Sequence, residues 1–147
     1  NYFNDDLKSI VVERDPRDVF ILNKYVWFIN GVSIPYPLDV YEFCDYYKRM
    51  RQSEIINKSN KILRIHFENL IYNYDKQVKE IEDFIGFSNK DHVNKFSRFN
   101  PKISINNTQL FRKKEYEDEV KIIEKELKDY LYNFPCEINN DVKNSID

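Results

Sequence analysis

The chain has 147 residues, with 23 basic and 25 acidic side chains and a formal net charge of −2. This length suits one domain with its own core, and the near-neutral charge argues against binding to nucleic acid or anionic membranes. No apolar run is long enough to span a bilayer and no signal-like start is present, so we expect a cytoplasmic protein without a transmembrane segment. Because residue 1 is not Met, we expect a piece of a longer protein.

The first predicted elements are a strand and a helix. Residues 7–13 are apolar and β-branched, which is typical of a buried strand. Asp15 can cap a helix that begins at Pro16. The helix is predicted over residues 16–29, because apolar residues recur at three- and four-residue steps and form one core face: Val19, Leu22, Val26 and Ile29.

A loop is predicted over residues 31–37, because Gly31, Pro35 and Pro37 interrupt regular structure. A helix over 38–52 follows, and its shared face is formed by Leu38, Tyr41, Cys44 and either Tyr47 or Lys48. After a polar stretch, residues 61–67 alternate well enough for a second strand. The two strands predict a helix-rich α/β fold with a small parallel sheet flanked by helices.

The second half is predicted to be mostly helical. A helical turn over 68–72 precedes a helix that Asp75 caps and Gly86 ends. Residues 88–114 are irregular in pattern, with a short helix near 92–96. A strongly periodic segment over 116–134 predicts an amphipathic helix that packs on its own domain, with a coiled-coil seam as the alternative. We assign residues 1–135 to the domain and 136–147 to a polar, disordered tail.

Scarce residue types limit the chemistry. Gly, Cys and His each occur twice, so neither a Gly-rich phosphate loop nor a closed zinc site is expected, and no metal is assigned. The two cysteines are read as inert thiols, with one disulfide as the alternative. His66 and Glu13 are read as a buried structural histidine and a salt-bridge partner, so no catalytic residue is assigned.

The junction over residues 11–20, VVERDPRDVF, is the candidate site. Arg14 lies at the carboxyl end of a predicted strand, where ligands bind in open α/β sheets, and its planar fork suits phosphate. The alternative is that Arg14 pairs with Asp15, Asp18 or a nearby glutamate.

This junction, together with RIHFENLIYNYDKQVKEIEDFIGF, resembles the sulfotransferase family, which transfers a sulfuryl group from 3′-phosphoadenosine-5′-phosphosulfate (PAPS) and releases 3′-phosphoadenosine-5′-phosphate (PAP). The family motifs Arg-x-Pro-x-Asp, Tyr-Glu-Asp-Leu and Phe-Leu-Gly read here as RDPRD from Arg14, FENL from Phe67 and FIG from Phe84. The resemblance covers residues 7–132 and implies part of a P-loop-NTPase-like sulfotransferase fold.

The resemblance also implies roles for individual residues. Arg14 would hold the 3′-phosphate, and Phe67 would stack near the adenine, with a core aromatic after the strand as the alternative for Phe67. Leu22 stands where the family has a serine, so the neighbouring Asn23 becomes the candidate donor. Arg112 and Lys113 would match the basic segment that closes over the 3′-phosphate, with a solvated basic turn as the alternative. Glu68 would brace the backbone.

Two functions from different classes remain open. One is a sulfotransferase in its complete form, acting on a hydroxyl or amine of a carbohydrate, lipid or small molecule; the family's basic 5′-phosphosulfate loop has no counterpart in this chain. The other is a non-catalytic module that binds nucleotides or a protein. A different α/β nucleotide fold, such as a kinase relative, fits no better. An open sheet edge also predicts self-association.

Overall fold

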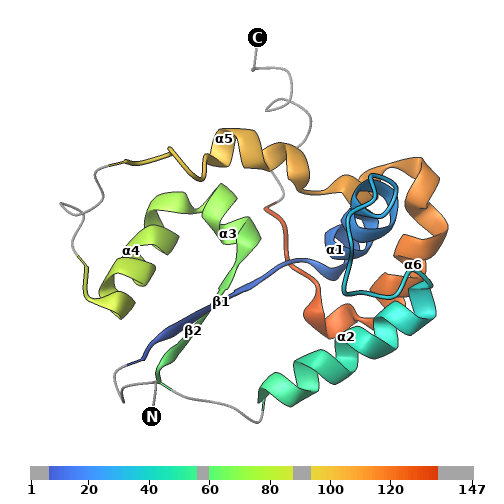
Figure 1. The fold of residues 1–147 in the computed structure, drawn as a ribbon, viewed down its shortest axis with the longest axis horizontal. Coiled ribbons are helices and arrows are strands. Elements are labelled where there is room, and N and C mark those ends of the chain that lie inside the picture. The colour runs from blue at the N-terminus through green and yellow to red at the C-terminus, as the bar shows by residue number, and fades with distance from the viewer. Residues whose placement is uncertain (1–6, 56–59, 88–93, 136–147) are drawn as a thin grey trace.

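The chain folds into a helix-rich α/β structure with a two-stranded parallel sheet flanked by helices. The structure is a computed structural model and describes residues 7–55, 60–87 and 94–135. Figure 1 shows the sheet between two groups of helices, with α3, α4 and α5 on one side and α1, α2 and α6 on the other. The tail predicted over 136–147 lies outside the described residues.

Strand β1 (Ser9–Glu13) pairs in parallel with β2 (Ile62–His66), and Val12 lies opposite Ile65. Both strands fall within the predicted ranges. The prediction that the first strand is buried was wrong, because Ile10 and Val12 are exposed. A strand becomes buried on both faces when helices cover both faces of a larger sheet, and here the described sheet contains only these two strands.

The helix predicted over 16–29 begins at Pro16 as expected but changes its hydrogen bonding after Leu22. Helix α1 (Pro16–Leu22) continues into a π-helical turn, η1 (Asn23–Trp27), in which the Phe28 N–H donates to the Asn23 carbonyl. A π turn inserts one residue and so rotates every later side chain by about 100°. Val26 and Ile29 are therefore exposed instead of lying on the predicted core face.

The main core lies between helices and not around the sheet. It joins α1 to α2 (Val40–Ile55) and α6 (Glu117–Glu126). On α2 the buried face is Val40, Phe43, Cys44 and Tyr47, whereas Tyr41, predicted to face the core, is exposed. The buried core residues are Phe20, Ile21, Val40, Phe43, Cys44, Tyr47, Phe111, Val120, Ile123 and Leu127.

Helices α3 (Phe67–Tyr72) and α4 (Tyr74–Ile85) follow β2 directly, and Gly86 ends α4 in the left-handed conformation, as predicted. The prediction that Asp75 caps α4 was wrong, because Asn73 is the N-cap and Asp75 lies in the first turn. The helix expected near 92–96 falls partly outside the described residues, and 94–96 form a turn in which Phe96 has a φ of 68°. Helix α5 (Pro101–Ser104) was not predicted, although Asn100 caps it just as Asp15 caps α1. The short 3₁₀ turns that follow are η3 (Ile105–Asn107), η4 (Leu110–Arg112) and η5 (Lys114–Tyr116).

The last helix is shorter than the periodicity predicted. Helix α6 ends at Glu126, a 3₁₀ turn η6 (Lys128–Tyr130) follows, and residues 131–135 run extended beside the start of α1. The extended course lets the Tyr132 N–H donate to Asp15 at 3.0 Å. Among the described residues, no helix is long and apolar enough to cross a membrane.

Candidate functional site

The junction between β1 and α1 is built around Asp15, whose side chain is fully buried. Its carboxylate caps α1 by accepting the Arg17 N–H at 2.9 Å, and Pro16 occupies the first turn, where a missing N–H costs nothing. The Asp15 backbone N–H donates to Glu68 at 2.9 Å. This last contact confirms that Glu68 braces the backbone and ties the start of α3 to the start of α1.

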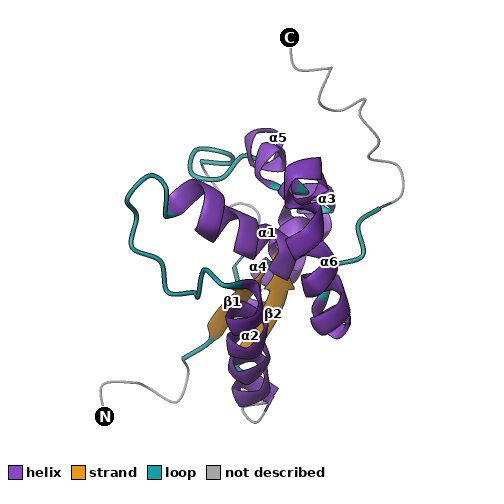
Figure 2. Cartoon of the chain, turned by 90° about the vertical axis from the view of Figure 1, so that its right-hand side faces the viewer, coloured by secondary structure: helices purple, strands orange, loops and turns teal. Residues whose placement is uncertain are grey.

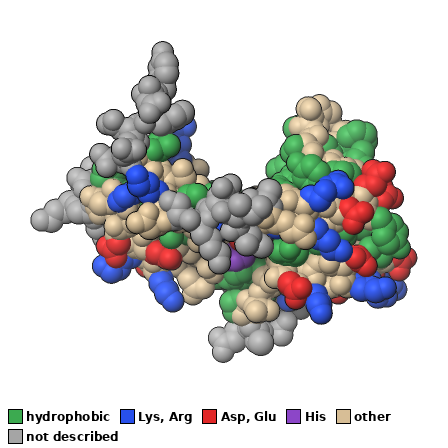
Figure 3. Space-filling model, turned by 90° about the horizontal axis from the view of Figure 1, so that it is seen from below, with side chains coloured by type: hydrophobic (Ala, Val, Ile, Leu, Met, Phe, Trp, Pro, Cys, Tyr) green, Lys and Arg blue, Asp and Glu red, His purple; other side chains and the backbone are tan. Residues whose placement is uncertain are grey.

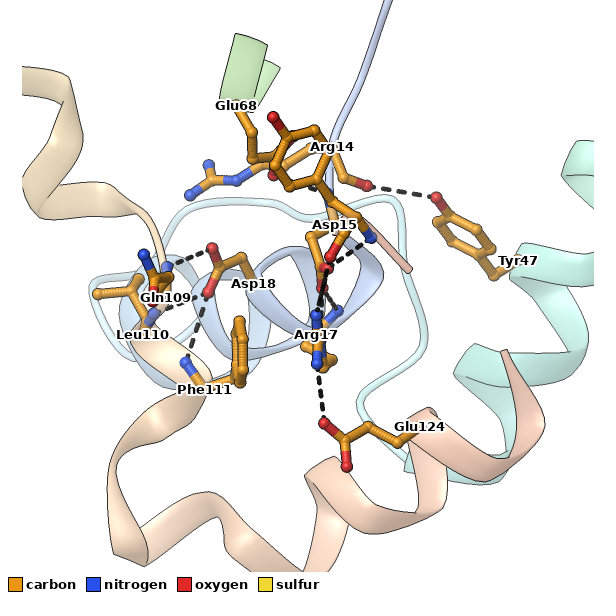
Figure 4. A network of polar contacts seen from close by, with 11 residues as sticks. Arg14, Asp15, Arg17, Asp18, Tyr47, Glu68, Gln109, Leu110, Phe111 and Glu124 are labelled. Carbon is orange, nitrogen blue, oxygen red and sulfur yellow. Dashed lines mark hydrogen bonds and ion pairs between the residues drawn. The ribbon is translucent and has the colours of Figure 1, made fainter. Parts of the chain in front are cut away.

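Arg17 connects this junction to α6 and to the chain after it. Its guanidinium donates twice to Asp15, at 2.9 and 2.7 Å, and once to Glu124 at 2.8 Å. It also lies over the Phe111 ring, 3.9 Å from the centroid. Burial acts to lower the pKa of Arg17, but the hydrogen bonds and charges of Asp15 and Glu124 outweigh it and raise that pKa. Arg17 is therefore a structural residue (Figure 4).

Asp18 holds a distant segment against α1. Its carboxylate accepts backbone N–H groups from Gln109 at 2.7 Å, Leu110 at 2.8 Å and Phe111 at 3.4 Å. Gln109 adopts the left-handed conformation with a φ of 57°, which is unfavourable for a residue with a side chain. The three hydrogen bonds stabilise that turn and place the segment beside Arg14 (Figure 4).

Replacing Asp18 with asparagine is expected to change how stability depends on pH. Burial raises the pKa of Asp18 from 3.8 to about 6, although the charge of Arg14 and the N–H bonds from Gln109 and Phe111 act to lower it. Between these values the folded chain binds more protons than the unfolded chain, so Asp18 makes stability fall as the pH rises. That fall, on the order of 1–3 kcal/mol, should be missing in Asp18→Asn. Urea unfolding from pH 4 to 7 measures it, and parallel curves for the two proteins would contradict it.

Arg14 differs from its neighbours because it enters no ion pair within the described part of the chain. Its guanidinium carbon lies 4.7 Å from the centroid of the Phe67 ring, and one nitrogen donates to the Asn107 carbonyl. Its Nε atom is buried and has no hydrogen-bond partner. Burial lowers the pKa of Arg14, while the charges of Asp18, Glu68 and Asp15 oppose that effect. The alternative reading, in which Asp15, Asp18 or a nearby glutamate pairs directly with Arg14, is therefore wrong for the residues that the structure describes.

The described acidic side chains around Arg14 do not form an ion pair with it. Glu13 is ion-paired with Arg51 at 2.5 Å and Arg64 at 3.2 Å, which confirms its reading as a salt-bridge partner. Burial raises the pKa of Glu68, and its second oxygen has no partner.

His66 lies half-exposed at the end of β2 and its Nδ1 has no partner, so the expectation of a buried, satisfied histidine was wrong.

The structure brings some of the predicted site residues together and separates others. Phe67 and Arg14 are in contact. The backbone hydrogen bonds that Asp18 accepts hold the segment that leads into Arg112 and Lys113. Both of these side chains are exposed, and Lys113 lies 3.9 Å from Glu115. Asn23 is 1% exposed and donates to the Val19 carbonyl at 2.7 Å, so its side chain is directed into the protein.

Two contacts of the junction were not found by sequence reasoning. Asn107 presents its carbonyl to Arg14, and Tyr132 donates its backbone N–H to Asp15. Both are main-chain groups far along the chain, so no residue type signals them.

Cys44 is a buried free thiol. Burial raises the pKa of its thiol to about 11, which fits the prediction of an inert thiol. Cys136 lies outside the described residues.

In the parts of the chain that the structure describes, no three or more His, Cys, Asp or Glu side chains lie close enough to hold a metal ion. Comparison with models of protein families, with curated proteins and with solved structures found no match to this chain.

Proposed function

We propose that the chain is part of a PAPS-dependent sulfotransferase and that Arg14 binds the 3′-phosphate of the nucleotide. The observation that carries the proposal is that Arg14 forms no ion pair within the described residues. Its guanidinium lies at the carboxyl end of β1 and over the Phe67 ring, and its Nε atom has no hydrogen-bond partner. The other charged members of the motif, Asp15, Arg17 and Asp18, are engaged in holding the fold.

The surrounding residues fit one end of such a nucleotide. Arg14 offers the planar donor geometry that phosphate requires. Phe67 offers an aromatic ring beside it, and Arg112 and Lys113 add exposed positive charge on the segment that Asp18 anchors. Asn23 does not fit as a phosphate donor, because its side chain is buried and already donates to Val19. No described residue is assigned to the 5′-phosphosulfate end.

In the complete reaction, PAPS supplies the sulfuryl group. A bond forms between sulfur and the acceptor oxygen or nitrogen as the bond from sulfur to the leaving phosphate oxygen breaks. This chain would hold the nucleotide by its 3′-phosphate and so position the sulfuryl group for attack by the acceptor. The parallel pairing of β1 with β2, each followed directly by a helix, supports a partial P-loop-like sulfotransferase fold.

A second candidate is nucleotide binding without transfer. It is favoured by the acidic side chains near Arg14, because transfer to a hydroxyl usually requires a base that can reach the acceptor. Glu68 has one oxygen without a partner, but it is fully buried. Glu13 is ion-paired with two arginines, and Asp18 accepts three backbone N–H groups. Incubation with PAPS and a panel of hydroxyl and amine acceptors separates the two functions, since only the enzyme releases PAP together with a sulfated product.

We expect PAP to bind the chain and AMP, which lacks the 3′-phosphate, to bind at least tenfold more weakly. The reason is that a charge-assisted, bidentate contact to phosphate contributes about 1.5–3 kcal/mol. Arg14→Ala should abolish the difference between PAP and AMP, and Arg14→Lys should retain only part of it because lysine lacks the fork. Calorimetric titration measures both.

The matched control is Arg49→Ala, which removes an exposed arginine from α2 and should leave PAP binding unchanged. A chain that binds AMP as tightly as PAP would overturn the 3′-phosphate assignment. The assignment would also fail if Arg14→Ala and Arg14→Lys folded normally and bound PAP as the unmodified chain does.

A further inference from the structure

An apolar tip protrudes from the molecule where η1 ends. It consists of five side chains that are 38–69% exposed: Val26, Trp27, Phe28, Ile29 and Val32. Figure 2 shows the helix of α1 and η1, and the loop after it, extending sideways from the body. In Figure 3 this projecting end, at the upper right, shows hydrophobic side chains and backbone, and the charged side chains begin closer to the body. So many large apolar side chains in seven residues mark an interaction surface.

The apolar tip is also uncharged. Residues 25–38 contain no Asp, Glu, Lys, Arg or His, in a chain of which 33% of residues are charged. The charge closest in sequence on the N-terminal side, Lys24, is ion-paired with Glu119 at 2.5 Å. The tip can therefore leave water without the large cost of desolvating a charge.

Four backbone N–H groups of the apolar tip are hydrogen-bonded within the tip and η1. The N–H groups of Phe28, Asn30, Gly31 and Val32 all donate to carbonyls between Asn23 and Phe28, at 2.9 to 3.2 Å. The Asn30 side chain donates to the Val26 carbonyl at 2.6 Å. Internal pairing of this kind is what an apolar, water-poor environment demands of a backbone.

The size and shape of the apolar tip favour a lipid surface over a second copy of the chain as its binding partner. Five side chains at about half exposure offer roughly 500 Å², taking about 200 Å² for each. A stable protein interface buries about 800 Å² on each partner, and a projecting tip would need a matching hollow. A bilayer accepts a convex apolar tip without a matching shape, and tryptophan is enriched at its interface.

We propose that the apolar tip of residues 26–32 docks the chain onto the surface of a neutral lipid bilayer by inserting Trp27, Phe28 and Ile29 into the interface. This inference is independent of the proposed nucleotide site. It requires no spanning helix, because the segment would lie in the interface and not across it.

Trp27 is the single tryptophan of the chain, so its fluorescence reports on the tip alone. Adding phosphatidylcholine vesicles to the full chain should shift the emission of Trp27 to shorter wavelength. Vesicles with brominated acyl chains should quench it, since quenching requires contact with the hydrocarbon region. A titration of vesicles gives the partition coefficient.

Two isoleucines provide a matched pair of variants. Ile29, in the tip, is 69% exposed, and Ile103, on α5, is 67% exposed. Ile29→Ser should weaken partitioning by roughly tenfold, because a large apolar side chain no longer enters the bilayer. Ile103→Ser should leave partitioning unchanged, and both variants should keep the unfolding midpoint of the unmodified chain.

Two results would overturn the proposal. One is an emission spectrum and sedimentation profile that vesicles do not change. The other is a shift to shorter wavelength that appears without vesicles and grows with protein concentration, since that would place a second copy of the chain on the tip.

Discussion

Replacing Arg17 with alanine is expected to lower the free energy of unfolding by about 3–5 kcal/mol, the usual cost of removing one partner of a buried ion pair. Arg17 is 8% exposed and fully buried Asp15 is its main partner. The substitution would leave the Asp15 carboxylate with backbone N–H donors alone. It would also remove the cation stacked on Phe111 and the link to Glu124 on α6. Urea unfolding followed by circular dichroism measures the loss.

A double variant separates the buried charge from the lost packing. If the unpaired carboxylate of Asp15 is the main cost, Asp15→Asn with Arg17→Ala should be less destabilised than the sum of the two single variants. Arg49→Ala, at an exposed position on α2, should change stability by less than about 0.5 kcal/mol. A loss below about 1 kcal/mol for Arg17→Ala would show that Arg17 is not central to the junction.

Phe43→Ala should lower the free energy of unfolding by about 3–5 kcal/mol, since it opens a cavity in the core between α1 and α2. Phe43 is fully buried, and its ring centroid lies 5.1 Å from that of Phe20 and 5.8 Å from that of Tyr47. The change removes no titratable group, so the loss should not depend on pH between 4 and 7. Thermal or urea unfolding measures it.

The control for this cavity is Tyr41→Ala on the same helix. Tyr41 is 60% exposed, so losing its ring should cost less than about 1 kcal/mol. The pair also tests the face of α2, because the sequence pattern placed Tyr41 in the core. Equal losses of stability for Phe43→Ala and Tyr41→Ala would mean that α2 buries a different face against the core.

The local signals of the sequence were reliable where a few neighbouring residues determine the conformation. Asp15 and Pro16 begin α1, and Gly86 ends α4, because a cap, a fixed φ and a left-handed residue act over one turn. The strands were found for a similar reason, because a short β-branched apolar run marks β1 and side-chain alternation marks β2, and both are local properties. The same rule marks Asn100 and Pro101, so α5 was predictable but was missed.

Errors arose where distant contacts compete with periodicity. The apolar spacing over 116–134 continues beyond Glu126, yet the chain leaves the helix and the Tyr132 N–H reaches Asp15, 117 residues earlier. After Leu22, a π turn replaces the α-helical register, so the apolar face predicted for 26–29 is exposed. Periodicity cannot indicate such a change, because it assumes a constant number of residues per turn.

The sequence by itself determined the two strands, the start of α1, the end of α4 and the place of Arg14 at the carboxyl end of the first strand. These follow from residue type and short-range spacing, whereas Phe67 was assigned to the site only by the resemblance to sulfotransferases. Only the tertiary structure decided which charges in RDPRD are engaged. Asp15 pairs with Arg17 and accepts the Tyr132 N–H, Arg17 also reaches Glu124 on α6, and Asp18 accepts N–H groups from the segment after α5. Arg14 finds no ion pair among the described residues. The physical reason is that a charged side chain takes its role from the groups that fold against it, and those lie far away in the sequence.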